Sequence, residues 1–281
     1  MRHLAVALFR FISLVLLIAI ISAGPICALA GETIRINGSG TGLEMMKPLI
    51  QAYVKSAPEV LFEMEKPLGS SGAIKALIAG VLDIAVSSKP LKPEESAQGA
   101  KLSYFGKTPL AIVTGSNVPV SNISIEELES IYSGRTRKWS NNENIRVVLR
   151  PLEDIDTKIL RGLSPGMDEA IVLAQNRRGM ITAVTDPESN QAVANTIGGI
   201  GTSGLAGIMV EKAALKILLL NGVKPTIASL AEGRYPLAKE IHFVTTGKLS
   251  ESGRKFLDFI YSEKGRAVVE NIGVLTAAGG E

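Results

Sequence analysis

Cysteine and histidine are almost absent from this sequence, which holds one cysteine, Cys27, and two histidines, His3 and His242. A disulfide needs a pair of cysteines, and a structural zinc site needs several cysteine or histidine ligands. A hydrolytic serine needs a base beside it, and nothing in the sequence pairs a serine with His242. The composition therefore favours a protein with no disulfide, no metal, no cofactor and no catalytic activity.

Long apolar runs are missing beyond the first thirty residues, which have the pattern of a cleaved export signal. Arg2 and Arg10 supply positive charge, residues 11–24 are apolar, and Ala28-Leu29-Ala30 matches the small-x-small site of signal peptidase. The run is shorter than the roughly 20 residues that span a membrane. We expect residues 1–30 to be a signal peptide and the mature protein to be periplasmic.

A strong excess of one charge is also missing. Thirty lysines and arginines face 27 aspartates and glutamates, and two of the arginines lie in the expected signal peptide. Nucleic-acid-binding proteins usually carry a marked positive excess, so we expect no nucleic-acid partner.

Strand-like and helix-like segments alternate along the rest of the chain. Residues 33–37, 60–65 and 83–87 have strand patterns, and the first two are each followed by a helical pattern. Repeats of this kind predict an α/β fold of mostly parallel sheets flanked by helices. Pro48 is expected to lie in the first turn of the first helix or to kink it.

The second half of the chain continues in the same manner. A capping box of Ser124 and Glu127, with Gly134 at the far end, predicts one helix, and two amphipathic helices are expected on either side of Ser262. Gly199-x-Gly201-x-x-Gly204 matches the dinucleotide fingerprint in form only, because the preceding segment looks helical. We interpret these glycines as packing or turn positions.

Glycine and serine gather where three of the expected strands end. GSGTG (38–42), GSSG (69–72) and Ser87-Ser88 follow these strands, and the carboxyl ends of parallel strands meet at one edge of a sheet. Helix N-termini there offer free amides, glycine allows close approach, and hydroxyls donate without adding charge. Arg150, at the end of another strand, would add a fixed positive charge. Each Gly-Ser pair could instead be an ordinary turn or helix cap, but three together favour a site for a small anion.

Longer motifs add a resemblance to a known family. They are NGSGTG, LGSSGAIKALIAGVLDIAVSS, LESIYSGRTRKW, TIGGIGTSGLAGI, EGRYPLAKEI and FLDFIYSEKGRAVVENIG. With Tyr132, Ser133, Gly134 and Trp139, and with Gly233, Tyr235, Pro236 and Leu237, they resemble type II solute-binding proteins, in particular the periplasmic phosphate-binding proteins of phosphate ABC transporters.

The resemblance implies two α/β lobes with a cleft between them and a hinge of two crossing segments. Lobe I would hold residues 32–107 and 240–281, and lobe II residues 108–239. The protein would be a monomer that clamps a small oxyanion, phosphate first, and presents it to a membrane ABC permease.

The resemblance also assigns residues to the site. First-loop donors fall on Thr41, Gly42 and Leu43, the second-loop serine on Ser70, and the arginine on Arg150. The complete predicted anion-binding set is Thr41, Gly42, Leu43, Ser70, Ser71, Ser87, Ser88, Arg150 and Thr157.

Two departures from the family pattern leave the ligand open. Ser88 replaces an aspartate that accepts the proton of hydrogen phosphate, which would favour sulfate, molybdate or tungstate. Glu153, Asp154 and Asp156 replace donors after the arginine, and a carboxylate within about 4 Å of an anion costs several kcal/mol in a cleft of low dielectric. We expect these carboxylates to face solvent; otherwise one accepts a proton from the ligand, or the ligand is not a simple oxyanion. A ligand sensor or interaction protein on the same fold is the alternative that this acidic loop suggests.

Overall fold

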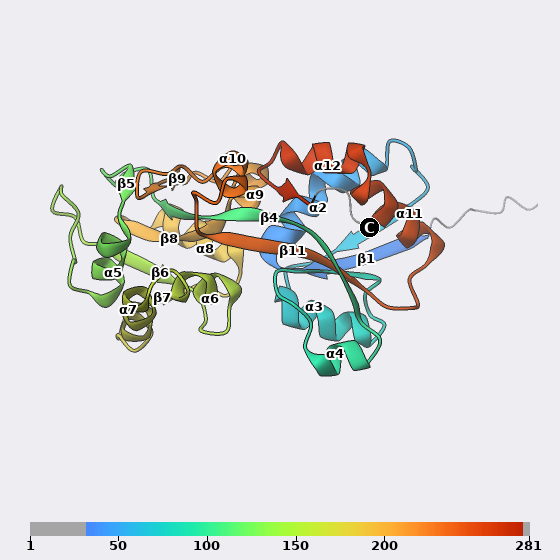
Figure 1. The fold of residues 1–281 in the computed structure, drawn as a ribbon, viewed down its shortest axis with the longest axis horizontal. Helices are drawn as coiled ribbons and strands as arrows, with labels where there is room; N and C mark the ends of the chain where they lie inside the picture. The colour runs from blue at the N-terminus through green and yellow to red at the C-terminus, as the bar shows by residue number, and fades with distance from the viewer. Residues whose placement is uncertain (1–31, 278–281) are drawn as a thin grey trace, which may run out of the picture. The chain divides into compact units, whose positions relative to one another are not determined.

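Strands and helices alternate through residues 32–277, the part of the chain that the computed structural model describes (Figure 1). The strands are β1 Thr33–Gly38, β2 Leu61–Met64, β3 Ile84–Ser87, β4 Lys101–Thr114, β5 Asn122–Ile123, β6 Arg146–Leu149, β7 Ile181–Thr182, β8 Gly199–Gly204, β9 Lys216–Ile217, β10 Leu219–Leu220, β11 Ala238–Thr245 and β12 Leu275–Thr276. The helices are α2 Gly40–Tyr53, α3 Gly69–Ile78, α4 Pro93–Ala97, α5 Ile125–Ser133, α6 Ile155–Arg161, α7 Pro165–Gln175, α8 Asp186–Asn195, α9 Leu205–Glu211, α10 Ile227–Ala231, α11 Glu251–Tyr261 and α12 Glu263–Glu270. The expected signal peptide lies outside the described residues.

The main sheet runs in the order β2-β1-β3-β11-β4-β8-β6-β7, with β9 and β12 added to β4. The pairs toward both ends are parallel, as predicted: β1 pairs with β2 and β3, and β6 pairs with β7 and β8. The middle of the order is antiparallel, because β4 and β11 run against each other and against their outer neighbours.

Strand β4 connects two lobes, each with its own hydrophobic core. Its first part pairs with β11 from Lys101 to Pro109, and its last part pairs with β8 from Leu110 to Thr114. Phe105 of β4 lies in the core that we call the core of lobe I, whereas Leu110 and Ile112 lie in the core of lobe II. β4 and β11 are therefore the two segments that cross between the lobes (Figure 1).

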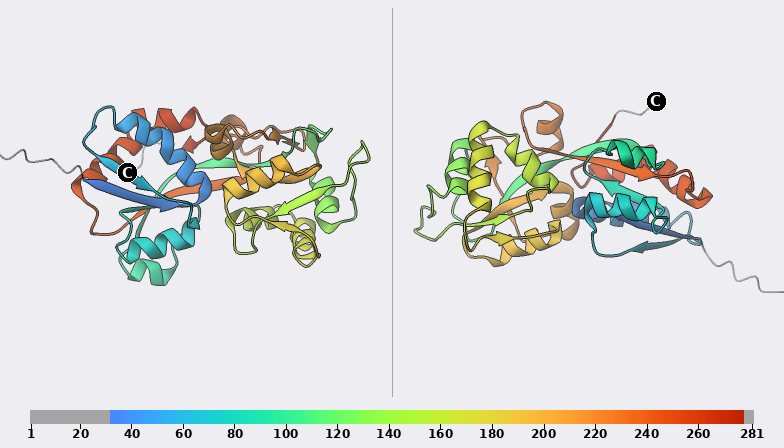
Figure 2. Two further views of the ribbon diagram at one scale, coloured as in Figure 1. Left: turned by 180° about the vertical axis from the view of Figure 1, so that it is seen from behind. Right: turned by 90° about the horizontal axis from the view of Figure 1, so that it is seen from below.

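Helices cover both faces of the sheet in lobe I (Figures 1 and 2). Ile84 and Val86 of β3 pack in the same core as residues of α2, α11 and α12. Ala85, which points to the opposite face because side chains alternate along a strand, packs with α3 instead. Burial on both faces explains why β3 is apolar without alternation.

Most predicted elements are confirmed, with differences that have clear causes. α5 carries the expected capping box and ends at Gly134 with a φ of 82°. Pro48 lies in the interior of α2, because the helix already begins at Gly40, where Ser39 caps it. β4 is the longest strand of the described residues and runs from Lys101 to Thr114.

The glycines of the false fingerprint lie within strand β8, not in a loop after it, and their packing role is confirmed. A Cβ on Gly199 would come within 2.7 Å of the Val193 carbonyl oxygen, and one on Gly201 within 2.8 Å of the Val193 side chain. Glycine here lets α8 pack closely on the strand.

Truncation of a core aromatic should cost far more stability than truncation of an exposed apolar residue. Phe256 is fully buried, with ring centroids 4.9 Å from Tyr53 and 4.7 Å from Phe62. We expect Phe256→Ala to lower the free energy of unfolding by about 3–5 kcal/mol and Leu173→Ala, at a 55% exposed residue, by less than about 0.5 kcal/mol. Guanidinium unfolding measures both, and equal losses would contradict the described core.

Candidate anion-binding site

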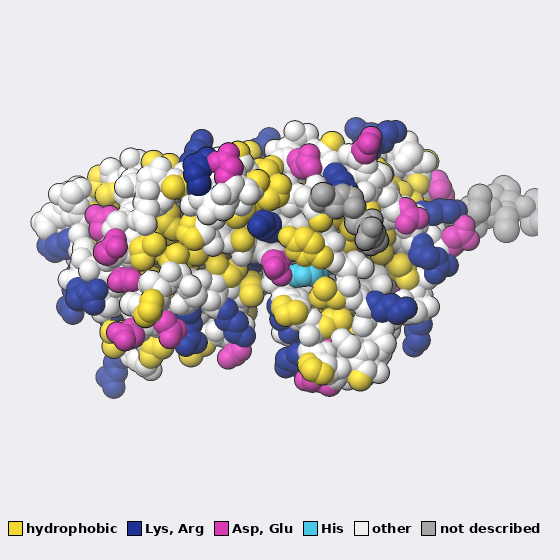
Figure 3. Space-filling view, viewed as in Figure 1, with side chains coloured by type: hydrophobic (Ala, Val, Ile, Leu, Met, Phe, Trp, Pro, Cys, Tyr) yellow, Lys and Arg dark blue, Asp and Glu magenta, His cyan; other side chains and the backbone are white. Residues whose placement is uncertain are grey.

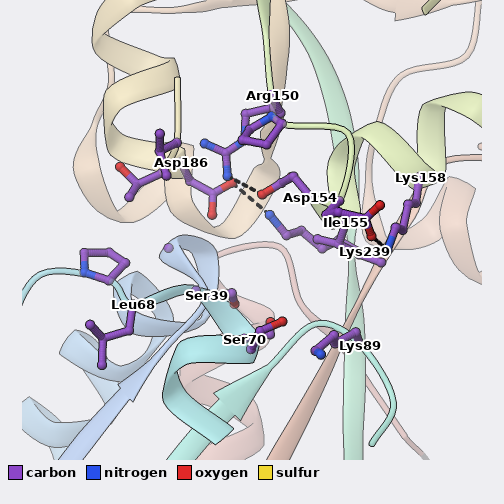
Figure 4. A pocket seen from close by; sticks show the side chains of 18 residues that line it. Ser39, Leu68, Ser70, Lys89, Arg150, Asp154, Ile155, Lys158, Asp186 and Lys239 are labelled. Atoms are coloured by element: carbon purple, nitrogen blue, oxygen red, sulfur yellow. Dashed lines mark hydrogen bonds and ion pairs between the residues drawn. The ribbon is translucent and has the colours of Figure 1, made fainter. Parts of the chain in front are cut away.

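A cavity of about 250 Å³ lies between the starts of α2 and α3 on one side and the start of α6, the start of α8 and β11 on the other. In the space-filling view the surface is notched between α3 and α6, with lysine and arginine side chains on both sides (Figure 3). Figure 4 shows charged side chains on one wall and serines near helix starts on the other. The lining residues are Ser39, Gly40, Pro67, Leu68, Gly69, Ser70, Ser71, Lys89, Arg150, Pro151, Glu153, Asp154, Ile155, Lys158, Val184, Thr185, Asp186 and Lys239.

The lobe I wall begins at the N-terminus of α2. Ser39 caps this helix, and its Oγ accepts a hydrogen bond of 3.2 Å from the Gly42 amide. The hydroxyl of Ser88 donates to the same Oγ at 3.0 Å. The amide of Thr41 points across to lobe II and donates to Asp186 Oδ2 at 2.9 Å. Three chain segments therefore meet at the start of α2.

The N-terminus of α3 forms the rest of this wall. No side chain caps the helix, and Gly69 adopts a φ of 71°, which glycine reaches without strain. Ser70 and Ser71 come next in the first turn of α3 and line the cavity. Ser70 Oγ accepts a hydrogen bond from the Ser88 amide at 3.0 Å. Lys89 lies on the same wall, and its Nζ is 3.9 Å from Glu95 Oε1. The amides of an uncapped helix start suit an anion.

On the lobe II wall, Arg150 follows β6 and is 6% exposed. Its Nη2 donates to Asp154 Oδ2 at 2.8 Å and its Nη1 to the Ala183 carbonyl at 3.3 Å, while Nε has no partner. Thr157 Oγ1 and Gln175 Nε2 both donate to the Arg150 carbonyl and so fix this backbone. These two bonds use two of the five N–H groups of the guanidinium.

A buried triad forms the inner end of this wall. Lys239 of β11 is 1% exposed, and its Nζ lies 2.7 Å from Asp156 Oδ1 and 2.8 Å from Asp186 Oδ1. Since Asp186 also accepts from Thr41, one series of contacts runs from α6 through β11 and α8 to the start of α2. Buried charges need such partners, because an unpaired one costs several kcal/mol.

The two carboxyl groups of the triad, those of Asp156 and Asp186, have very different pKa values. Burial raises the pKa of Asp156 to about 6, with the attraction of Lys239 opposing this change. Burial also raises the pKa of Asp186, but Lys239, Arg150 and the Thr41 amide outweigh it and lower the pKa to about 2. Asp186 is thus the permanently ionised member. Burial lowers the pKa of Lys239, yet the two carboxylates raise it above its ordinary value.

Three of the nine predicted site residues line the cavity: Ser70, Ser71 and Arg150. The structure places the other six, Thr41, Gly42, Leu43, Ser87, Ser88 and Thr157, outside its lining. The amides of Thr41, Gly42 and Leu43 already donate to Asp186 Oδ2, Ser39 Oγ and the Ser39 carbonyl. Ser87 Oγ donates to the Lys89 carbonyl at 2.7 Å. The anion-binding role of all nine stays a prediction.

Most of the lining residues were not in the predicted set, among them the polar residues Ser39, Lys89, Asp186 and Lys239. Ser39 is the actual cap of α2, and GSGTG contains it. Asp186 follows Thr185 at the capping box that starts α8, so its acidic character looked like ordinary helix capping. Lys239 lies in a strand with an apolar pattern, where a lysine normally faces solvent.

The three carboxylates of the acidic loop after Arg150 lie in different environments, so the expectation that all of them face solvent is wrong in part. The Glu153 side chain is 89% exposed and pairs with Lys158, as expected. Asp156 is fully buried against Lys239, and Asp154 binds Arg150 at the cavity wall. Arg150 lies only four positions before Asp154, whereas Lys239, the partner of Asp156, comes from a distant part of the sequence.

His242 lies in β11, does not line the cavity and packs edge-on against Tyr104 at 5.4 Å. Between residues 32 and 277 no group of three or more histidine, cysteine or acidic side chains could hold a metal ion. The same residues contain no helix with the length and apolar character of a membrane span.

Ionisation of Asp156 should give stability a distinctive pH dependence. The folded protein, with a pKa of about 6 against an ordinary 3.8, binds the Asp156 proton across a range where the unfolded chain has lost it. Stability should therefore fall by about 2 kcal/mol as pH rises from about 4 to about 6. The decline should be absent in Asp156→Asn, which cannot ionise, and present in Glu153→Gln.

Urea unfolding at several pH values measures this slope. Asp186 contributes in the opposite direction, because stability from its lowered pKa is lost only as pH falls from about 4 to about 2. Equal slopes in the wild type and Asp156→Asn between pH 4 and 6 would contradict the described triad.

Comparisons with known proteins identify the family of this chain and several of its relatives. A family model described as "PBP superfamily domain" matches residues 26–264. The chain is 28% identical over 258 residues to the phosphate-binding protein PstS of Borreliella burgdorferi, covering 87% of this chain and 90% of that one. It is 23% identical to PstS of Bacillus subtilis, covering 90% and 89%.

Solved structures show the same fold. A Clostridium perfringens protein solved with bound phosphate superposes with a TM-score of 0.73 at 23% identity, covering 88% of this chain and all of that one. An ABC-type phosphate transport receptor from Vibrio cholerae gives 0.60 at 22% identity, covering 88% and 100%. At these identities the likeness establishes the two-lobe α/β fold.

Proposed function

Because the chain belongs to the PBP superfamily, we propose that it is an exported solute-binding protein that captures a small oxyanion and presents it to a membrane ABC permease. Inorganic phosphate is the first candidate, since two relatives that match nearly the whole chain are named phosphate-binding proteins. The protein acts as a periplasmic monomer after removal of residues 1–30. It catalyses no reaction and binds no nucleic acid.

One observation carries this proposal: an uncapped helix start and a buried arginine face the same cavity from different lobes. The amides and hydroxyls of Ser70 and Ser71 lie on one side, and Arg150, with a free Nε, lies on the other. A tetrahedral oxyanion accepts from several directions at once, so it can bind both walls and hold the lobes together.

The carboxylate on the cavity wall favours an oxyanion that carries a proton. Asp154 lines the cavity beside Arg150 and is 18% exposed at its side chain. Hydrogen phosphate and phosphonates can donate a proton to such an acceptor, whereas sulfate has no proton to give at neutral pH and would be repelled. Asp154 thereby supports phosphate, although Ser88 alone would favour sulfate, molybdate or tungstate.

We propose the lobe boundaries at residues 32–107 with 240–281 for lobe I and residues 108–239 for lobe II. The pairing of β4 supports this division, since its partner changes from β11 to β8 near Leu110. Closure about this crossing would move Ser70 relative to Arg150.

A second candidate is a ligand sensor or interaction protein on the same fold. It is favoured by the two carboxylates, Asp154 and Asp186, that face Arg150 and Lys239 and already compensate much of their charge. A transporter component should be stabilised by its solute, whereas this second candidate need not be.

Removal of the arginine should weaken anion binding. We expect Arg150→Ala to reduce the affinity for phosphate by about 2 kcal/mol or more, because a charge-assisted hydrogen bond is lost. Arg146→Ala, at the exposed start of the same strand β6, should leave the affinity unchanged. Isothermal titration calorimetry measures both, and equal affinities would reject the role of Arg150.

A thermal-shift panel should separate the candidate solutes and the two candidate functions. Phosphate at 100 times its dissociation constant should add about 2.7 kcal/mol of stability. Phosphonates should also stabilise the protein, and sulfate, molybdate and tungstate should do so less. Stabilisation by none of them would favour the sensor or interaction protein.

A further inference from the structure

Asp186 lies where an anion entering the cleft would meet the start of α2. Its carboxylate accepts from the Thr41 amide at 2.9 Å and from Lys239 Nζ at 2.8 Å, and the residue is 3% exposed. A carboxylate is itself a small oxyanion, and a helix amide together with an ammonium is the usual arrangement for binding one. The chain therefore supplies its own anion at this position.

The backbone on the opposite wall fits this carboxylate closely. A Cβ on Gly40 would lie 2.5 Å from Asp186 Oδ2 and 2.7 Å from Asp186 Cβ. Glycine at the first position of α2 thus leaves the space that the Asp186 side chain fills, so a tetrahedral solute has no room there while Asp186 stays in place.

The balance of charges also disfavours a second anion at the start of α2. Arg150 and Lys239, the two buried cations of this region, contact or lie near three carboxylates, those of Asp154, Asp156 and Asp186. A further anion at the start of α2 would have no uncompensated cation there and would face the ionised Asp186 directly. The inner end of the cleft is thus closed to anions by shape and by charge.

The outer part of the cavity offers hydrogen-bond donors that Asp186 does not occupy. α3 has ten residues and no side-chain cap, and Ser70 and Ser71 of its first turn line the cavity. Arg150, more than nine-tenths buried, lines it from the other lobe with its Nε unpartnered. Lys89 adds a cation to the lobe I wall.

We propose that Asp186 is a built-in competitor at the start of α2, so that the solute oxyanion binds in the outer part of the cleft, between the N-terminus of α3 and Arg150. This inference rests on the proposed function, because it places the solute of that same site. Asp186 sets selectivity by removing the Thr41 amide and Lys239 from the set of anion donors.

The first test needs no variant. Phosphate is titrated into the uniformly ¹⁵N-labelled wild-type protein while backbone amide shifts are recorded. The largest changes are expected at Gly69, Ser70 and Ser71, and the Thr41 amide should keep its shift because its partner stays in place. A Thr41 change larger than those of the α3 amides would show that phosphate displaces Asp186 and would overturn the proposal.

The second test removes the competing charge. Asp186→Asn keeps a side-chain oxygen for Thr41 but removes one negative charge from the inner end, which leaves two carboxylates against two cations, so phosphate affinity by calorimetry should rise about tenfold or more. Asp168→Asn removes a carboxylate of α7 that does not line the cavity and should change affinity less than about threefold. Ser71→Glu, which puts a negative charge at the start of α3, should weaken binding about tenfold.

The outcomes separate this inference from the proposed function. Binding by the wild type with no gain in Asp186→Asn overturns the inference and leaves the function standing. Absence of binding in the wild type contradicts the function; a gain in Asp186→Asn would then still support the competitor role, and no gain would overturn it. Circular dichroism checks folding, and Asp186→Ser replaces a variant that fails to fold.

Discussion

The ammonium of Lys239 holds together segments that are far apart in the sequence. It lies between Asp156 of α6 and Asp186 of α8, and Asp186 in turn binds the Thr41 amide of α2. Without these partners, a charge this deeply buried would destabilise the fold by several kcal/mol. These contacts connect the starts of α6, α8 and α2 and so hold the two walls together at the inner end of the cleft.

The same arrangement explains how a nearly neutral cleft can serve an anion. Two cations and three carboxylates leave little net charge, so attraction must come from directed donors: the amides of α3, the serine hydroxyls and the guanidinium of Arg150. Directed hydrogen bonds distinguish oxyanions by geometry and protonation, which a uniform positive patch does not. The wall carboxylate of Asp154 then becomes an acceptor for a proton on the solute.

Local patterns predicted much of the fold. Apolar runs, the Ser124–Glu127 capping box and glycines at helix ends depend on neighbours in sequence, and the structure confirms them. The motif residues Ser70, Ser71 and Arg150 also line one cavity.

The inner half of the site could not be predicted from the sequence, because its residues come together only when the chain folds. Lys239 follows Asp156 by more than eighty positions, and no spacing rule connects them. An aspartate at the first position of a helix, such as Asp186, has an ordinary explanation in the helix dipole. The sequence likewise predicted Asp156 to be solvent-exposed, since loop carboxylates usually are; only the position of β11 reveals its partner.

The most direct test of this account is a crystal structure of the mature protein grown with phosphate. We predict one phosphate ion between the first turn of α3 and Arg150, within hydrogen-bond distance of both and beside Asp154, with Asp186 still bound to Lys239 and Thr41. A cleft without phosphate, or a phosphate ion on the Thr41 amide with Asp186 turned away, would contradict it.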